Sequence, residues 1–210
     1  MRGRTAGSGK NAEQRSASSV GVLVLAGGAG SRMGREKSTL SLDGKTFLSV
    51  ITEQFQDFPE RLLSVGQKEL LECHGFHPVF DRYPGCGPIG GIHAGLLACR
   101  SAYLLVLGCD MPFYPAALAR YLSLLLEEGV DVLIPVDGGG RSHPLGGIYA
   151  KSVAPVLEQQ IREGDYRLQS VLKKLSVKRI PLDTSGYSDQ ALSNINTPED
   201  YAAMCGGKSL

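Results

Sequence analysis

The sequence has no long apolar segment, no excess of charge of one sign and no paired cysteine motif. Its longest apolar runs, such as residues 103–107, are far too short to span a bilayer, so no membrane-spanning helix is expected. The 22 basic and 21 acidic residues nearly cancel, which gives no reason to expect nucleic acid or a membrane surface as a partner. The five cysteines are scattered without a CxxC pair, which indicates reduced thiols in a cytoplasmic protein, not a disulfide framework or zinc site.

Two common phosphate-binding motifs are also missing from the glycine-rich stretch at residues 23–40, LVLAGGAGSRMGREKSTL. A P-loop requires a glycine before the Lys-Ser pair, but Glu36 precedes Lys37. A dinucleotide-binding fingerprint would place a third glycine where Met33 stands. No Ser-His-Asp spacing and no histidine metal motif appears in the chain. If this stretch binds phosphate, it does so in another way.

The chain of 210 residues suits a single domain with a short appendage. Residues 1–19 contain almost nothing apolar, so they lack the core of a signal peptide and are interpreted as a disordered tail. No internal repeat or linker interrupts the rest, and residues 20–210 are predicted to form one domain.

Short apolar runs alternate with amphipathic stretches after the tail, which predicts an α/β protein. Strands are expected at residues 20–26, 61–65, 103–108, 131–136 and 177–182. Helices are expected at residues 47–58, 91–100, 115–128, 154–162, 167–175 and 198–204. Alternation of this kind is typical of a mostly parallel sheet covered by helices on both faces, and ligands of such sheets bind at the carboxyl ends of the strands.

The glycine-rich stretch follows the first predicted strand, at the edge where such a ligand would bind. Glycines from Gly27 onward allow backbone N–H groups to turn toward an anion, and Arg32 and Lys37 add positive charge. A glycine-rich turn with a solvated basic helix start explains the same residues equally well.

Two aspartates also follow apolar runs. Asp110 ends LLVLGCD, and one carboxylate opposite phosphate-binding cations is a typical arrangement for Mg²⁺. The alternative is that Asp110 caps the helix predicted to follow it. Asp81 opens the glycine-rich DRYPGCGPIGGI segment and could accept a hydrogen bond from a base or ribose, or simply begin a turn.

Later residues carry weaker signals. Asn194 and Asn196 stand on alternate positions before the final predicted helix, so extended backbone would point both amides the same way. Asparagines in an ordinary turn fit equally well. His143, in RSHPLGGIY, is expected to be an exposed loop histidine. His77 is expected at the surface, and His93 receives no role.

Taken together, these segments resemble the molybdenum cofactor guanylyltransferases of the nucleotidyltransferase superfamily. LAGGAGSRMGREK is similar to the family signature LAGGxSxRMGxDK, with Glu36 where the family usually has aspartate. The match continues in family order through GPIGGI, LGCDMPF, HPLGGIY and NINTPED, across roughly residues 20 to 205. The tail at residues 1–19 has no family counterpart.

The resemblance implies a three-layer αβα, Rossmann-like fold. It also implies transfer of GMP from GTP to a molybdopterin-type cofactor, with release of pyrophosphate and Mg²⁺ as the metal. The product would be handed on to a molybdoenzyme or its chaperone.

Matching positions assign nucleotide-binding and catalytic roles to individual residues. The backbone of Leu25, Ala26 and Gly27 would contact the nucleotide, as would Asp81. Lys37 and Arg32 would bind the phosphates, and Asp110 would bind Mg²⁺. A loosely aligned nucleotide contact falls near Ser64. The cofactor side would comprise Asn194, Asn196 and Arg167.

Two other functions remain open from the sequence. One is a related nucleotidyltransferase that uses CTP or a different phosphorylated acceptor. The resemblance implies that the AGG turn at residues 26–28 goes with guanine, and Gly27, which lacks a Cβ atom, would leave room for a large base. The other is a carrier that binds nucleotide or cofactor without catalysis, which would not need the Asp110 carboxylate.

Overall fold

A computed structural model of the chain describes residues 20–27, 41–42, 45–66, 75–182, 186–195 and 200. Several predictions made from the sequence lie outside these residues. They are the tail at 1–19, the cations Arg32 and Lys37, the second asparagine Asn196 and nearly all of the predicted final helix.

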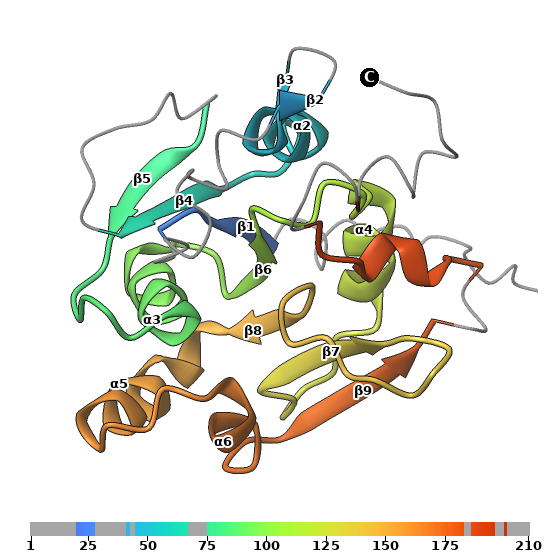
Figure 1. Cartoon of the computed structure of the whole chain (residues 1–210). Coiled ribbons are helices and arrows are strands. Elements are labelled where there is room, and N and C mark those ends of the chain that lie inside the picture. The colour runs from blue at the N-terminus through green and yellow to red at the C-terminus, as the bar shows by residue number, and fades with distance from the viewer. Residues whose placement is uncertain are drawn as a thin grey trace, which may run out of the picture.

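A seven-stranded sheet lies at the centre of the described part, in the order β5-β4-β1-β6-β8-β7-β9 (Figure 1). The strands are β1 (Val20–Leu25), β4 (Arg61–Gly66), β5 (His77–Phe80), β6 (Tyr103–Gly108), β7 (Val132–Val136), β8 (Ile148–Ala150) and β9 (Val177–Pro181). Strand β8 runs antiparallel to both of its neighbours, β6 and β7, and the other pairs are parallel. The mostly parallel sheet is therefore confirmed. A separate pair, β2 (Ser41–Leu42) and β3 (Lys45–Thr46), is antiparallel.

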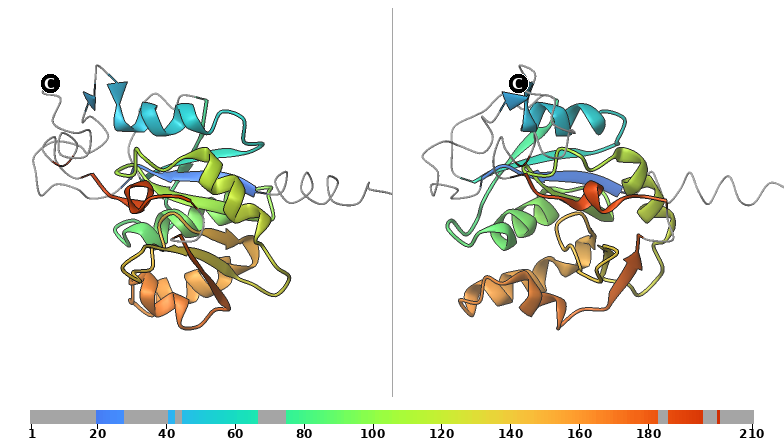
Figure 2. Two further views of the ribbon diagram at one scale, coloured as in Figure 1. Left: turned by 90° about the vertical axis from the view of Figure 1, so that its right-hand side faces the viewer. Right: turned by 45° about the vertical axis from the view of Figure 1, so that its right-hand side comes forward.

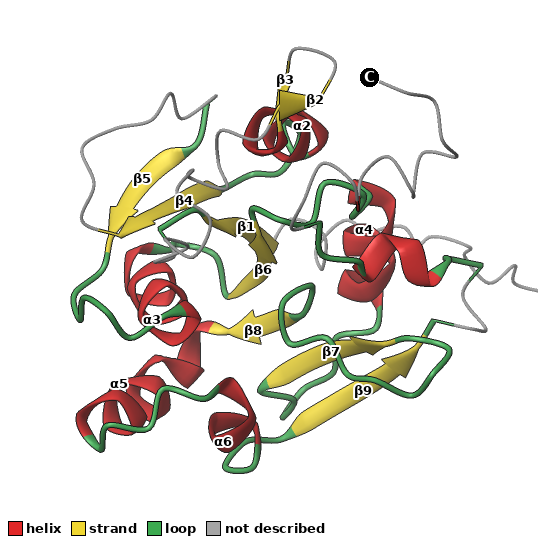
Figure 3. Cartoon of the chain, viewed as in Figure 1, coloured by secondary structure: helices red, strands yellow, loops and turns green. Residues whose placement is uncertain are grey.

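Helices cover both faces of the sheet (Figures 2 and 3). They are α2 (Phe47–Gln54), α3 (Pro88–Ala98), α4 (Ala116–Leu124), α5 (Ala154–Arg162) and α6 (Leu168–Leu172), with the 3₁₀ turns η3 (Lys151–Val153) and η4 (Asp189–Leu192). One core cluster joins the sheet to α2 and α4, and the other joins it to α3, α5 and α6. The predicted three-layer α/β fold is confirmed. In the described part of the chain, no helix has the length and apolar character needed to cross a membrane.

The central strand β1 shows how the sequence specifies these layers. Val20, Val22 and Val24 enter the core beneath α2 and α4, whereas Leu23 enters the core beneath α3. This is the alternation expected of a strand buried on both faces. Helix α3 lies so close to β1 that a Cβ atom on Gly95 would be 2.4 Å from a methyl of Leu23.

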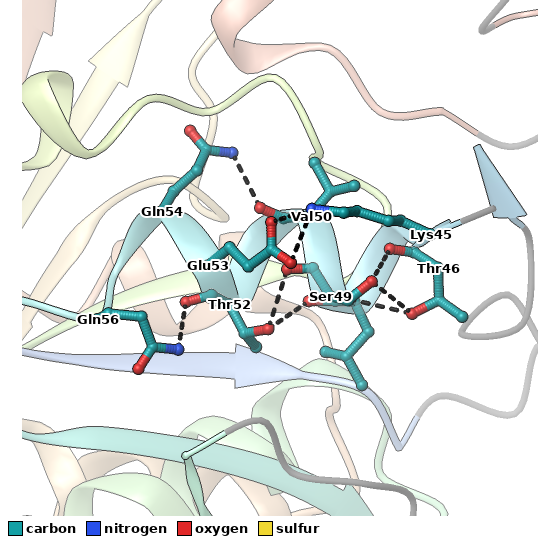
Figure 4. A network of polar contacts seen from close by, with 9 residues as sticks. Lys45, Thr46, Ser49, Val50, Thr52, Glu53, Gln54 and Gln56 are labelled. Atoms are coloured by element: carbon teal, nitrogen blue, oxygen red, sulfur yellow. Dashed lines mark hydrogen bonds and ion pairs between the residues drawn. The ribbon is translucent and has the colours of Figure 1, made fainter. Parts of the chain in front are cut away.

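Polar contacts hold helix α2 along its length, and Figure 4 shows those within the helix and with Lys45 and Thr46 before it. Thr46 caps its start by accepting a hydrogen bond from the Ser49 N–H at 3.1 Å, and Lys45 pairs with Glu53 at 2.8 Å. Near its end, the Gln54 side-chain amide donates to the carbonyl oxygen of Pro112 at 3.0 Å. The helix therefore supports the turn that follows β6.

Some predicted boundaries are wrong. Strand β6 and helix α5 match the prediction residue for residue, but α4 ends at Leu124 and not at residue 128. The helix ends because the chain turns at Leu125. Leu125 and Leu126 still pack against the core, so the apolar pattern in the sequence continues past the end of the helix. Strands β5 and β8 were not predicted.

The histidine without a predicted role, His93, is fully buried in α3. Neither of its ring nitrogens has a hydrogen-bond partner in the described structure. Its ring lies 5.5 Å from that of Tyr83, whose hydroxyl donates to Glu158 at 2.7 Å. Burial lowers the pKa of His93, with Glu158 opposing the shift and Arg82 adding to it.

This burial predicts acid sensitivity of the fold. The unfolded chain takes up a proton near the ordinary pKa of histidine, about 6.5, whereas the folded protein resists protonation of His93 until lower pH. The free energy of unfolding is therefore fully maintained above that value and falls as the pH drops below it. Denaturant titrations between pH 7.5 and 5 should show a smaller loss in His93→Leu than in the wild type. His77→Leu, which removes an exposed histidine on β5, is the matched control. An equal loss in wild type and His93→Leu would contradict the prediction.

Candidate functional site

The carboxyl end of β1 is held from both sides by its neighbours in the sheet. The Ala26 N–H donates to the carbonyl oxygen of Ser64 on β4 at 2.8 Å, and the Cys109 N–H after β6 donates to that of Leu25 at 3.1 Å. These bonds extend the parallel ladder past the end of the strand. The backbone predicted to contact a nucleotide is therefore in a fixed position at the expected edge.

Gly27 lies directly against the backbone of β4. A Cβ atom on Gly27 would be 2.4 Å from the Gly66 nitrogen and 2.7 Å from its Cα, closer than real side chains approach backbone. Gly66 itself has a φ of 66°, a conformation that favours glycine. The missing side chain at Gly27 is thus required by packing within the chain, and the AGG turn does not by itself indicate guanine.

Asp81 follows β5 at the same edge and is anchored to β4. Its N–H donates to the carbonyl oxygen of Gly66 at 3.1 Å, and its carboxylate accepts from the buried Ser64 hydroxyl at 3.2 Å. Burial raises the pKa of Asp81, and the Ser64 hydrogen bond opposes the rise. A Cβ atom on Gly90 would lie 3.5 Å from the other carboxylate oxygen, so the start of α3 makes room for this group. Ser64, loosely predicted to contact nucleotide, orients Asp81.

Asp110 lies in the turn after β6. Its Oδ1 atom lies only 2.3 Å from where a Cβ atom on Gly108 would be, so the carboxylate folds back over that glycine. The alternative role as a helix cap is wrong, because α4 begins at Ala116 with Pro115 at the cap position. The observed position is that of a carboxylate presented at the edge of the sheet.

A backbone hydrogen bond connects Asp110 with the segment of Asn194, which is predicted to bind the cofactor. The Ile195 N–H donates to the carbonyl oxygen of Asp110 at 2.7 Å, which places the exposed Asn194 beside the same turn. Arg167 is engaged elsewhere: its guanidinium pairs with Asp165 through two bonds of 2.9 and 3.1 Å. The structure thus connects Asn194 with Asp110, and it gives Arg167 a different partner.

The spacing along the edge fits an extended ligand. Asp81 and Asp110 follow β5 and β6, which are three strand intervals apart in the sheet. At the usual spacing of neighbouring strands this is about 14 Å, a span that suits a base, sugar and phosphate chain and not a single small group.

The described residues contain no group of three or more potential metal ligands from His, Cys, Asp or Glu. Asp110 therefore offers a carboxylate without an all-protein cage around it. Such a donor set fits Mg²⁺, which usually retains several waters and is held by one or two carboxylates together with substrate phosphates.

A family model for the MobA-like NTP transferase domain matches residues 22–180. This chain belongs to that family. The chain has the nucleotidyltransferase fold. In it, Leu25–Gly27, Asp81 and Asp110 lie along the carboxyl edge of one sheet.

Named relatives agree with the assignment. A probable molybdenum cofactor guanylyltransferase of Carboxydothermus hydrogenoformans is 31% identical over 188 residues, which is 87% of this chain and 93% of the relative. A second, from Pelotomaculum thermopropionicum, is 32% identical over 182 residues, with 85% and 88% covered.

Solved structures show the same fold. The molybdopterin-guanine dinucleotide biosynthesis protein A of Archaeoglobus fulgidus superimposes with a TM-score of 0.76 at 30% identity, covering 88% of this chain and 97% of that one. The 2-C-methyl-D-erythritol 4-phosphate cytidylyltransferase of Thermus thermophilus reaches a TM-score of 0.63 at 20% identity, covering 88% and 96%. The second likeness establishes the fold alone.

The contact between Gly27 and Gly66 predicts that Gly27→Ala destabilises the protein. The added methyl would meet backbone atoms, which cannot move aside as a side chain end can, and overpacking of this kind costs about 1–3 kcal/mol or more. Chemical denaturation of the variant measures the loss. Gly139→Ala, in an exposed turn where the nearest atom is 3.3 Å from the added Cβ, is the control. Wild-type stability of Gly27→Ala would contradict the packing explanation.

Proposed function

We propose that the protein transfers GMP from GTP to a molybdopterin-type cofactor, forming the guanine dinucleotide cofactor and releasing pyrophosphate. The observation that carries the proposal is family membership over most of the chain together with relatives named as molybdenum cofactor guanylyltransferases. The arrangement of Gly27, Asp81 and Asp110 along one sheet edge supports it, because it offers an extended site to a nucleoside triphosphate.

The nucleotide occupies the β5-β4-β1-β6 half of the edge in this proposal. The Asp81 carboxylate, held by Ser64, accepts hydrogen bonds from the nucleoside, and the backbone at the end of β1 supports it. Lys37 and Arg32, assigned by family resemblance, bind the triphosphate. Asp110 is the residue we assign to hold Mg²⁺, which when bound would neutralise charge on the phosphates.

The terminal phosphate of the cofactor attacks the α-phosphorus of GTP, and pyrophosphate leaves on the opposite side. Two anions must meet in this step, so the enzyme accelerates it chiefly by positioning and by neutralising charge. A phosphate monoester is largely ionised near neutral pH, so no general base is required. The cofactor itself lies toward Asn194 and Asn196, and the product passes on to a molybdoenzyme or its chaperone. In the described part of the chain, Cys86 and Cys99 are free thiols, which supports a cytoplasmic location.

The proposal is tested with the full chain, Mg²⁺, molybdopterin and one nucleoside triphosphate at a time. Pyrophosphate should appear with GTP much faster than with CTP or ATP, and only when molybdopterin is present. Mass spectrometry of the product should show the guanine dinucleotide cofactor. Comparable turnover with CTP would overturn the guanine assignment. Binding of GTP and molybdopterin without pyrophosphate release would indicate the carrier function instead.

Asp110→Asn should abolish most of the transfer. Asparagine has the shape of aspartate and fits over Gly108, but it removes the charge that binds Mg²⁺. The rate should fall about a thousandfold, equivalent to about 4 kcal/mol of transition-state stabilisation. GTP affinity without Mg²⁺ should change little, whereas the gain in affinity on adding Mg²⁺ should be much smaller than in the wild type.

Calorimetric GTP titrations with and without Mg²⁺, beside turnover, measure these effects. Asp57→Asn, which alters an aspartate whose side chain is 87% exposed, is the matched control. A wild-type rate and metal response in Asp110→Asn would remove Asp110 from the mechanism.

A further inference from the structure

The connection between β7 and β8 contains an Asp–His pair that the proposed reaction does not yet use. His143, expected to be an exposed loop residue, donates from Nε2 to the Oδ2 atom of Asp137 at 2.8 Å, and the two side chains are only 15% and 17% exposed. The other carboxylate oxygen accepts the N–H groups of Gly139 at 3.0 Å and Arg141 at 2.9 Å. The His143 N–H donates to the carbonyl oxygen of Pro135 at 3.0 Å. The pair is thus built into the turn.

These contacts fix which ring nitrogen carries hydrogen. The hydrogen bonds from His143 and from the backbone lower the pKa of Asp137, so this carboxylate is ionised and can only accept. The imidazole therefore places its hydrogen on Nε2 when neutral, and Nδ1 presents a lone pair. In this state His143 can accept a hydrogen bond from a ligand.

The pair lies at the same edge of the sheet as Asp110. Gly147 contacts both β6 and β7. Its carbonyl oxygen accepts a hydrogen bond from the Val106 N–H on β6 at 2.9 Å. A Cβ atom on Gly147 would lie 3.6 Å from the Cα of Ile134 on β7. Strands β6 and β7 therefore reach the edge at the same level. With β8 between them, their ends are two strand intervals apart, about 10 Å.

A continuous set of contacts connects the turn with the cofactor side. The Gly138 N–H donates to the Asp189 carboxylate at 2.9 Å, which attaches the turn to η4. The chain leaving η4 carries Asn194 and then Ile195, whose N–H bonds the carbonyl oxygen of Asp110. The turn, η4 and the Asn194 segment therefore form one rim that begins at Asp110 and ends at His143.

We propose that His143, oriented by Asp137, is a binding residue for the ring end of the acceptor substrate and accepts a hydrogen bond from an N–H group of its pterin. This inference rests on the proposed function. The hydrogen bond from the His143 N–H to Pro135 places His143 on the β8 side of β7, next to the acceptor rim and not on the nucleotide half of the edge. A lone pair beside an ionised carboxylate also repels phosphate, whereas the amino and ring N–H groups of a pterin are donors that match it.

Two substitutions separate the two ring nitrogens. His143→Gln keeps an amide donor in the place of Nε2, which preserves the bond to Asp137, but removes the acceptor at Nδ1. His143→Asn keeps an acceptor near Nδ1 and loses the Nε2 contact. The Gln variant should raise the KM for molybdopterin about tenfold, the effect of one lost hydrogen bond, and leave the KM for GTP at the wild-type value. The Asn variant should have a KM for molybdopterin much closer to the wild-type value than the Gln variant has.

Direct binding distinguishes failure of this inference from failure of the proposed function. A free pterin without phosphate, followed by its fluorescence, should bind the wild type and bind His143→Gln about tenfold more weakly, whether or not the wild type transfers GMP. His77→Gln, an exposed histidine at the start of β5, is the control and should bind as the wild type does. Equal pterin affinity in wild type and Gln variant would overturn the proposal. Weaker inhibition by inorganic phosphate in the Gln variant, with pterin binding intact, would overturn the ring assignment in favour of phosphate.

Thermal melting shows whether the variants fold. A measurement on the wild type alone covers the case in which they do not: the ¹⁵N chemical shift of His143 Nδ1 should move when free pterin is added. An unchanged shift at saturating pterin would overturn the contact.

Discussion

The candidate site depends on the close approach of two backbone segments at the carboxyl ends of β1 and β4. Gly27 and Gly66 lie so near each other that neither position accommodates a side chain without movement or strain. This contact brings the end of β1 alongside Ser64, and Ser64 in turn holds Asp81. At this contact, the described part of the edge is glycine backbone beside the oriented carboxylate of Asp81, a surface that suits a flat ligand.

Much of the fold could be predicted because its strands and helices carry strong periodic patterns. The buried run of β6 and the amphipathic helix α5 have boundaries that the sequence marks clearly. Strand β8 has only three residues, and β5 contains Pro78 in four, so neither gives a period long enough to detect. Their existence follows from pairing with neighbouring strands, which is a tertiary effect.

The sequence predicts that the end of β1, Asp81 and Asp110 lie at one edge of the sheet, but not the contacts that hold them there. Asp110 was placed correctly at the end of β6, since a polar residue after a buried parallel strand must emerge at the carboxyl edge. The role of Gly66 could not be found, because its partner Gly27 is distant in sequence and the contact involves only backbone. The position of His143 could not be predicted either, because it depends on Asp137 and on a turn geometry that no local pattern specifies.

The one antiparallel strand of the seven-stranded sheet has a consequence for how specificity is encoded. Strand β8 separates a sheet half formed by β5, β4, β1 and β6 from a half formed by β7 and β9. The Asn194 segment returns from the second half to Asp110. In the proposed function, the nucleotide and its acceptor are recognised by two consecutive stretches of chain that meet at one carboxylate.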